Sequence, residues 1–178
     1  LIITQNIIDQ RSYNNAYREI TWADCTLRKY LNSEFYDKFT DIEKSRIIQV
    51  INKNLDNQWY GSPGGIDTQD YIFLLSIEEV ACKYFGDSSS KLYNRPKNQR
   101  YWLQRKDENN IKRIAWVEPN LGKGVWWWWL RSPGRDNKKA AYIFGDGNIG
   151  VQGNNIQKGN RIDGRCTGGV RPAMWIKL

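Results

Sequence analysis

The stretch VWWWWLRSPG at residues 125–134 places four tryptophans in succession and then turns abruptly polar. In a β-strand, successive side chains point to opposite faces, so Trp126 and Trp128 would face one way and Trp127 and Trp129 the other. The four indoles therefore cannot share one core, nor stack in series as a platform for a sugar. Because tryptophan is usually well buried, the run predicts a central strand with at least one buried pair. Whether the other pair belongs to the core or to a binding surface stays open, since amphipathic rings are also common at interfaces.

Short, turn-rich segments surround this strand. Downstream, Asp146-Gly147 lies between two apolar runs and predicts a β-hairpin. The chain then closes with GVRPAMWIKL, and IAWVE precedes the tryptophans. The second half is therefore expected to form a small twisted antiparallel sheet with long loops.

The first half has helical patterns. Leu27, Leu31 and Phe35 predict an apolar helix stripe, which we expect Asn32-Ser33 to divide into two short helices. The sequences Thr40–Glu43 and Ser76–Glu79 are capping boxes and predict two helix starts.

The helix that starts at Thr40 is expected to turn Ile47, Ile48 and Ile51 inward, and residues 71–75 read as a buried strand. The two halves then form two layers of a single α+β domain over residues 1–178.

Composition excludes several kinds of chemistry. The 178 residues contain no histidine, so Ser-His-Asp systems, histidine-ligated metals and histidine pH switches are excluded. The three cysteines, Cys25, Cys82 and Cys166, are too scattered to indicate a disulfide framework or a zinc site. Catalysis by carboxylates or lysine is left open by this composition, but no nucleophile–base pair is apparent, so we expect no enzymatic activity, no metal and no cofactor.

The net charge of +8 is unevenly distributed. Residues 1–85 carry 9 basic and 12 acidic side chains, whereas residues 86–178 carry 18 basic and 7 acidic ones. A basic half permits a polyanion or an acidic protein as partner, without choosing between them. No apolar run is long enough to cross a bilayer, which predicts a soluble chain, and LIITQN lacks the features of a signal peptide.

Several motifs together resemble one protein family. They are WWLRSPG, AAYIFGDGNI and GVRPAMWIKL in the second half, and IID at 7–9, DCTLRKYLNSEFYDKF at 24–39 and DYIFLLSIEEV at 70–80 in the first. This family resembles the variable proteins of diversity-generating retroelements, which have a C-type lectin fold distantly like that of formylglycine-generating enzymes. The activity of those enzymes is not implied, because they use a cysteine pair near the C-terminus where this chain has only Cys166.

The resemblance implies a variable region at about residues 126–165, with residues 1–130 and 166–178 as framework. Polar and aromatic side chains there, interleaved with apolar and glycine residues, suit a paratope-like surface. The predicted ligand-binding residues are Trp126, Trp127, Arg135, Asp136, Asn137, Tyr142, Phe144, Asn148, Gln152, Asn154, Asn155, Gln157, Asn160, Arg161, Asp163 and Arg165. An ordinary Asn/Gly-rich surface hairpin is the alternative that composition by itself favours.

Three further features are interpreted as structural. Arg131 and Arg171 belong to the framework motifs and are expected to bond backbone or carboxylate groups. Glu118-Pro119-Asn120 is similar to the calcium loop of true C-type lectins, but no WND-type strand follows the tryptophans. Asp67, Asp70, Glu78 and Glu79 could form a carboxylate cluster, although helix capping is the simpler role for the last two.

The family resemblance then implies a non-enzymatic protein that displays a diversified surface to an unidentified protein or cell-surface ligand, with nucleic acid not expected as a partner. The resemblance favours a cell surface or a virion as its location. The alternative is a fixed module that binds a cell-surface polyanion or carbohydrate.

Overall fold

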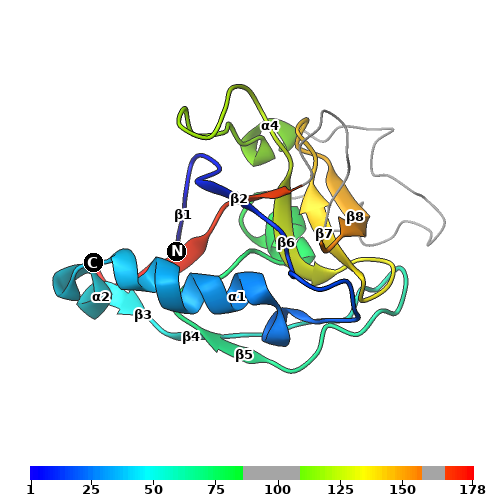
Figure 1. Ribbon diagram of the computed structural model, residues 1–178, viewed down its shortest axis with the longest axis horizontal. Coiled ribbons are helices and arrows are strands. Elements are labelled where there is room, and N and C mark those ends of the chain that lie inside the picture. Colours follow the sequence, from blue (N-terminus) through cyan, green and yellow to red (C-terminus); the bar gives the residue numbers. More distant parts are fainter. Residues whose placement is uncertain (86–108, 158–166) are drawn as a thin grey trace.

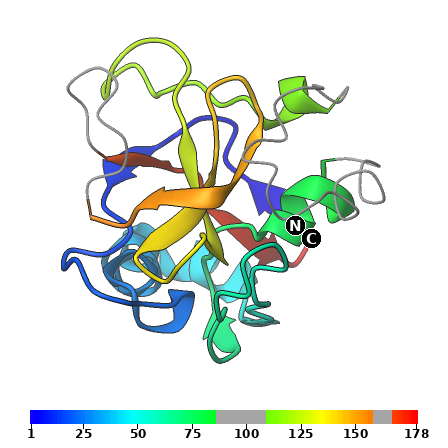
Figure 2. The same ribbon diagram turned by 90° about the vertical axis from the view of Figure 1, so that its right-hand side faces the viewer.

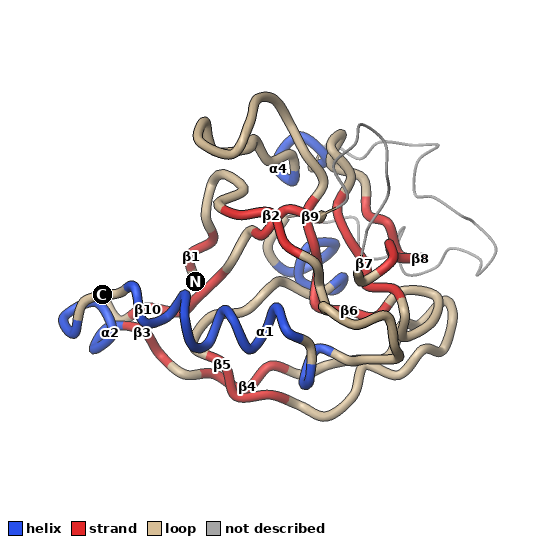
Figure 3. Tube along the Cα trace, in the orientation of Figure 1, coloured by secondary structure: helices blue, strands red, loops and turns tan. Residues whose placement is uncertain are grey.

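The computed structural model describes residues 1–85, 109–157 and 167–178 (Figure 1). Its described strands form a five-stranded, a three-stranded and a two-stranded sheet, and its helices are short. The α+β class predicted from the sequence is confirmed. Figure 3 shows how strands from both halves of the chain interleave, so the two halves are not two separate layers.

The five-stranded sheet is built around the tryptophan run. Its order is β2-β9-β6-β7-β8, with β6 in the centre. The sheet was expected to be antiparallel, but β6 and β9 run parallel, with Trp128 opposite Gly169. The long stretch of chain between β6 and β9 permits this, because parallel neighbours need a crossover connection. The strands are β2 (Asp9–Arg11), β6 (Trp128–Pro133), β7 (Lys139–Ile143), β8 (Ile149–Asn155) and β9 (Gly168–Val170).

Two smaller sheets lie beside it. The three-stranded sheet has the order β1-β10-β3, so the first and last strands of the chain are neighbours. The two ends of the chain accordingly lie close together in Figure 2. The two-stranded sheet pairs β4 with β5. The strands are β1 (Ile2–Ile3), β3 (Ile47–Ile48), β4 (Val50–Asn52), β5 (Thr68–Asp70) and β10 (Ala173–Ile176).

The predicted break at Asn32-Ser33 is wrong. A short 3-10 turn, η1 (Trp22–Asp24), comes first. It is followed by α1 (Thr26–Tyr30), the wider π turn η2 (Leu31–Phe35) and a last 3-10 turn, η3 (Tyr36–Lys38), so the backbone is helical without a break from Thr26 to Lys38. The Asn32 side chain, instead of ending the helix, accepts bonds from the Tyr71 and Ile72 amides and donates to the Ile72 carbonyl. It thereby ties the helix to the extended segment beside it.

The first capping box is confirmed, but its helix is shorter than predicted. Helix α2 (Asp41–Arg46) begins with reciprocal bonds between Thr40 and Glu43. The chain then becomes extended at β3, which buries Ile47 and leaves Ile51 of β4 67% exposed. The expectation that all three isoleucines turn inward is therefore wrong, because strand pairing replaces the helix after Arg46.

The second capping box is also present. The Ser76 amide donates to Glu79 Oε2 and the Ser76 hydroxyl accepts from the Glu79 amide. The π turn η4 (Glu79–Lys83) continues this helix. Of residues 71–75, predicted to be a buried strand, 72–75 are fully buried and Tyr71 is half-buried. Among these five residues only Phe73 pairs in β fashion, with Ala173.

The predicted hairpin at Asp146-Gly147 is confirmed. Strands β7 and β8 pair antiparallel on either side of it. Gly147 has φ +82°, a conformation that suits glycine. A Cβ there would lie 2.0 Å from the carbonyl oxygen of Asn110, the first residue of α4 (Asn110–Arg113). The turn is therefore also packed closely against that helix.

Candidate functional site

Most of the tryptophan run is core. Trp127, Trp128 and Trp129 are buried, and Trp126 is half-buried. The indoles of Trp127 and Trp129 lie on one side of β6, edge to face at 4.6 Å between centroids. On the other side, Trp128 donates through Nε1 to the Arg113 carbonyl. Trp127 and Trp129 thus lie on the side of the chain opposite Trp128, as predicted, and both faces of the strand are covered. Trp126 precedes β6, and its ring centroid lies 6.5 Å from that of Trp127, so its predicted grouping with Trp128 stays a prediction.

Four of the predicted ligand-binding side chains are buried instead of facing solvent. They are Trp127, Tyr142, Asn148 and Asn154. Tyr142 packs its ring edge-on against Trp127, with 5.4 Å between ring centroids. The Asn148 side chain donates to the Asp146 carboxylate and accepts from the Asn110 side chain. The expectation of solvent exposure is wrong for these four, because the sheet is covered on both sides.

Seven of the other predicted residues keep partial or full exposure. Arg135 is exposed, and Asp136, Asn137, Phe144, Gln152, Asn155 and Gln157 are half-buried. Asn160, Arg161, Asp163 and Arg165 lie outside the described residues.

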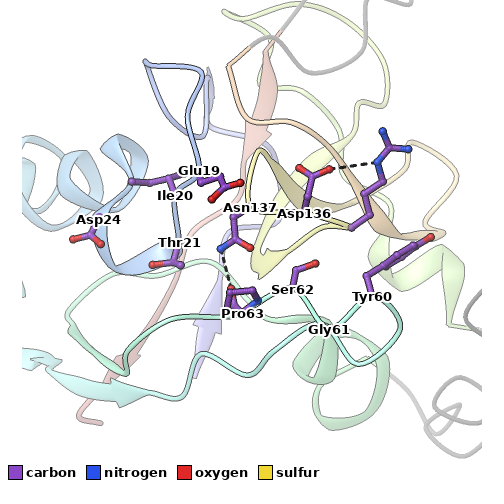
Figure 4. Close-up of a pocket in the computed structure, with 11 residues that line it drawn as sticks. Glu19, Ile20, Thr21, Asp24, Tyr60, Gly61, Ser62, Pro63, Asp136 and Asn137 are labelled. Carbon is purple, nitrogen blue, oxygen red and sulfur yellow. Dashed lines mark hydrogen bonds and ion pairs between the residues drawn. The ribbon is translucent and has the colours of Figure 1, made fainter.

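Three of the predicted residues contribute to one groove. The turn between β6 and β7 supplies Arg135, Asp136 and Asn137 to a depression of about 440 Å³. In Figure 4, Asn137 lies at its centre, with Glu19 and Thr21 to one side and Ser62 and Pro63 below. The complete lining is Glu19, Ile20, Thr21, Asp24, Tyr60, Gly61, Ser62, Pro63, Arg135, Asp136 and Asn137.

Sequence reasoning missed the eight lining residues that come from the framework. They belong to residues 19–21 before η1, to η1 itself, which contributes Asp24, and to the Gly/Pro-rich segment at 60–63. No local pattern marks Glu19, Asp24 or Tyr60. Only folding brings their segments against the β6–β7 turn.

Hydrogen bonds between the three segments fix the groove. The Ile20 amide donates to the Asn137 carbonyl at 3.0 Å. The Ser62 hydroxyl donates to the Gly134 carbonyl at 2.7 Å, and the Asn137 side chain donates to the Pro63 carbonyl at 3.0 Å. Both framework segments are thereby tied directly to the turn.

The lining carries more acidic than basic side chains. Glu19, Asp24 and Asp136 contribute carboxylates, and Arg135 contributes a guanidinium. Arg135 and Asp136 form an ion pair at 3.5 Å, with both side chains about half exposed. Such an exposed pair adds little stability and leaves both groups accessible to a ligand.

The other charged residues singled out in the sequence have structural partners. Arg131 bonds the Leu74 carbonyl and both carboxylate oxygens of Glu79, as its framework role predicts. Asp70 is fully buried and accepts bonds from Trp22, Arg28 and other side chains. These two carboxylates hold the fold together and do not line the groove.

The Arg171 guanidinium likewise donates to a backbone group, the Thr4 carbonyl, and it lies 5.0 Å from the centre of the Trp128 ring. Burial lowers the pKa of this guanidinium to about 10. In the EPN segment, Glu118 accepts a bond from the Asn6 side chain at 3.0 Å. Within the described ranges, no group of three or more carboxylate or cysteine side chains could hold a metal ion.

The fold and the site define an α+β protein with a groove made by three loops at its surface. The chain belongs to the family described as a domain of unknown function (DUF6273), which it matches over residues 1–178. No curated protein matches the chain, and no solved structure does. In the part of the chain that the structure describes, no helix has the length and apolar character needed to cross a membrane.

Proposed function

We propose that this protein is a non-enzymatic binding protein, in which a rigid scaffold of the C-type lectin type presents the β6–β7 turn to a protein or cell-surface ligand. One observation carries the proposal. The turn expected to vary forms a wall of the groove, and its backbone is held by framework residues.

The way in which the turn is held favours a replaceable surface. The Gly134 and Asn137 carbonyls accept bonds from Ser62 and Ile20, and the Arg135 amide donates to the Gln152 carbonyl at 2.9 Å. Every residue type offers the same carbonyl, and every type except proline the same amide. Side chains at 135–137 can therefore change while these three backbone contacts remain, and only the Asn137 side-chain bond to Pro63 is lost, as in antibody loops on a fixed framework.

The alternative, a fixed polyanion-binding module, finds no support at this groove. The groove is lined by three carboxylates and one guanidinium, so its excess of negative charge would repel a phosphate- or sulfate-rich polymer. Such a module would bind heparin with an affinity that falls steeply with salt and survives replacement of residues 135–137.

A pair of displayed libraries tests the proposal. The first randomises Arg135, Asp136 and Asn137, and the matched control randomises the buried Tyr142, Asn148 and Asn154. We expect most members of the first library to be folded and to yield binders to a test protein such as streptavidin, while most control members unfold. Equal loss of folding in the two libraries, or a folded first library without binders, would refute the proposal.

The proposed diversification by a retroelement has a separate test in the neighbouring DNA. We expect a near-identical repeat of the segment that encodes residues 126–165, differing at adenines, beside a reverse transcriptase gene. Absence of both removes the diversification and leaves the binding function standing.

A further inference from the structure

The side chain of Asn57 joins its own loop to the end of β6 and to β8. Its side-chain amide donates to the Pro133 carbonyl at 2.9 Å and to the Val151 carbonyl at 2.8 Å. Pro133 ends β6 immediately before the turn, and Val151 lies in β8. Asn57 is 1% exposed, so these bonds are shielded from water.

The same residue also shapes the loop that forms the opposite wall. Its Oδ1 accepts from the Trp59 amide, and its backbone carbonyl accepts from Gly61 at 2.7 Å. The Asn57 amide donates to the Ser62 carbonyl at 2.9 Å, which closes the loop into a compact turn. One side chain thus links the inner end of the 57–63 loop to the start of the β6–β7 turn.

The strands at this point approach too closely for a larger residue. A Cβ on Gly134 would lie 2.6 Å from the Gln152 carbonyl oxygen and 2.9 Å from the Gly153 Cα. The Asn57 amide bridges the carbonyls of Pro133 and Val151, adjacent to this contact. The direction in which residues 135–137 leave the sheet is therefore set at the Gly134 contact and at the Asn57 bridge.

We infer that Asn57 is the positioning residue of the binding surface, which fixes the Arg135–Asn137 turn against the 57–63 loop without touching the ligand. This deepens the proposed function and rests on it. Its side chain bonds only backbone groups, the carbonyls of Pro133 and Val151 and the amide of Trp59, so it serves any side chains that the turn carries. Without it, the turn remains folded but samples several orientations relative to Tyr60 and Glu19.

The test compares two buried asparagines. Asn57→Asp keeps the size and the acceptor for Trp59 but removes both donors, and Asn57→Ala removes the whole amide. The matched control is Asn52→Ala, because Asn52 is 5% exposed and donates to Asp70 instead of the turn. All variants are measured at a temperature at which circular dichroism shows them fully folded.

Hydrogen exchange provides a readout that needs no ligand. We expect the Arg135 amide to exchange at least about tenfold faster in both Asn57 variants than in wild type, and to be unchanged in Asn52→Ala. Equal exchange of this amide in the Asn57 and Asn52 variants would overturn the inference, whatever the function of the groove.

Binding provides the second readout. In a library clone selected against streptavidin, Asn57→Asp should weaken binding by at least about tenfold, whereas Asn52→Ala should not. Undiminished binding by the Asn57→Asp clone also overturns the inference. If no clone binds, the proposed function fails, and hydrogen exchange still decides the role of Asn57.

Discussion

The indole of Trp127 meets the indole of Trp129 edge-on, with planes at 81° and ring centroids 4.6 Å apart. Strand β9 lies against this pair, and a Cβ on Gly168 would be 2.3 Å from Trp129 Nε1 and 2.6 Å from Trp127 Cζ3. The double-sided burial of the tryptophan strand therefore requires a residue without a side chain in the neighbouring strand.

Replacing Gly168 by alanine should destabilise the protein, because the added methyl group must displace two buried indoles. We expect a loss of about 1–3 kcal/mol in the free energy of unfolding, measured by urea denaturation with tryptophan fluorescence. The control is Gly145→Ala, whose Cβ would meet, among the described residues, only Val125 at an ordinary 3.6 Å. Equal effects of the two substitutions would contradict this packing.

Glu79→Gln should be strongly destabilising, because it leaves the buried Arg131 guanidinium without its carboxylate. The expected loss is about 3–5 kcal/mol, the usual cost of breaking a buried pair. Asp136→Asn, which breaks the exposed pair with Arg135, should cost less than about 1 kcal/mol. The denaturant midpoints of the two variants test this prediction. Similar shifts of the midpoint in both variants would show that the ion pair between Arg131 and Glu79 does not stabilise the core.

Asp70→Asn should unfold more readily than wild type, because Asp70 accepts at Oδ2 from the Trp22 indole, the Asn52 amide and the Thr68 hydroxyl. In the variant, an amide nitrogen replaces one carboxylate oxygen of residue 70, so buried donors lose their acceptor. Each buried group left without a partner costs about 1–3 kcal/mol of unfolding free energy.

Asp67→Asn serves as its control, because Asp67 is exposed and accepts from the Asn54 amide. Thermal unfolding of both variants checks the prediction, and a smaller shift for Asp70→Asn than for Asp67→Asn would refute it.

Alkaline pH should weaken the fold in part through Cys25. Burial raises the pKa of this thiol from 9.0 to about 12, so the unfolded chain loses the proton at a lower pH than the folded one. The stability that this difference contributes is complete below pH 9 and is lost as pH rises through 12. Cys25→Ala should therefore show a shallower decline of unfolding free energy between pH 9 and 12.

The neighbouring Tyr13, whose phenol pKa burial also raises, contributes in the same direction and remains in that variant. Some decline is thus expected to persist. An unchanged slope in Cys25→Ala would exclude a contribution from the thiol.

Signals carried by adjacent residues were read correctly from the sequence. Both capping boxes form, the Asp146-Gly147 turn joins β7 to β8, and Trp127 and Trp129 lie on the side opposite Trp128. Each depends on bonds or geometry within a few residues, which local sequence specifies.

Signals that depend on distant partners were misread. The helix stripe at Leu27–Phe35 continues past Asn32 because that side chain finds the backbone of Tyr71 and Ile72. Tyr142, Asn148 and Asn154 look like surface residues in a polar segment, yet they are buried. The sequence of the hairpin does not reveal that both faces of its strands are covered in the folded protein.

The sequence by itself determined the α+β class, the central tryptophan strand and the Asp146-Gly147 hairpin, because these follow from side-chain period and turn chemistry. Only the tertiary structure decided which residues of the hairpin remain accessible. It also decided that Glu19, Asp24 and Tyr60 join the groove and that Asn57 supports it. The physical reason is that burial and concavity arise between segments far apart in the chain, whereas a sequence pattern records only neighbours.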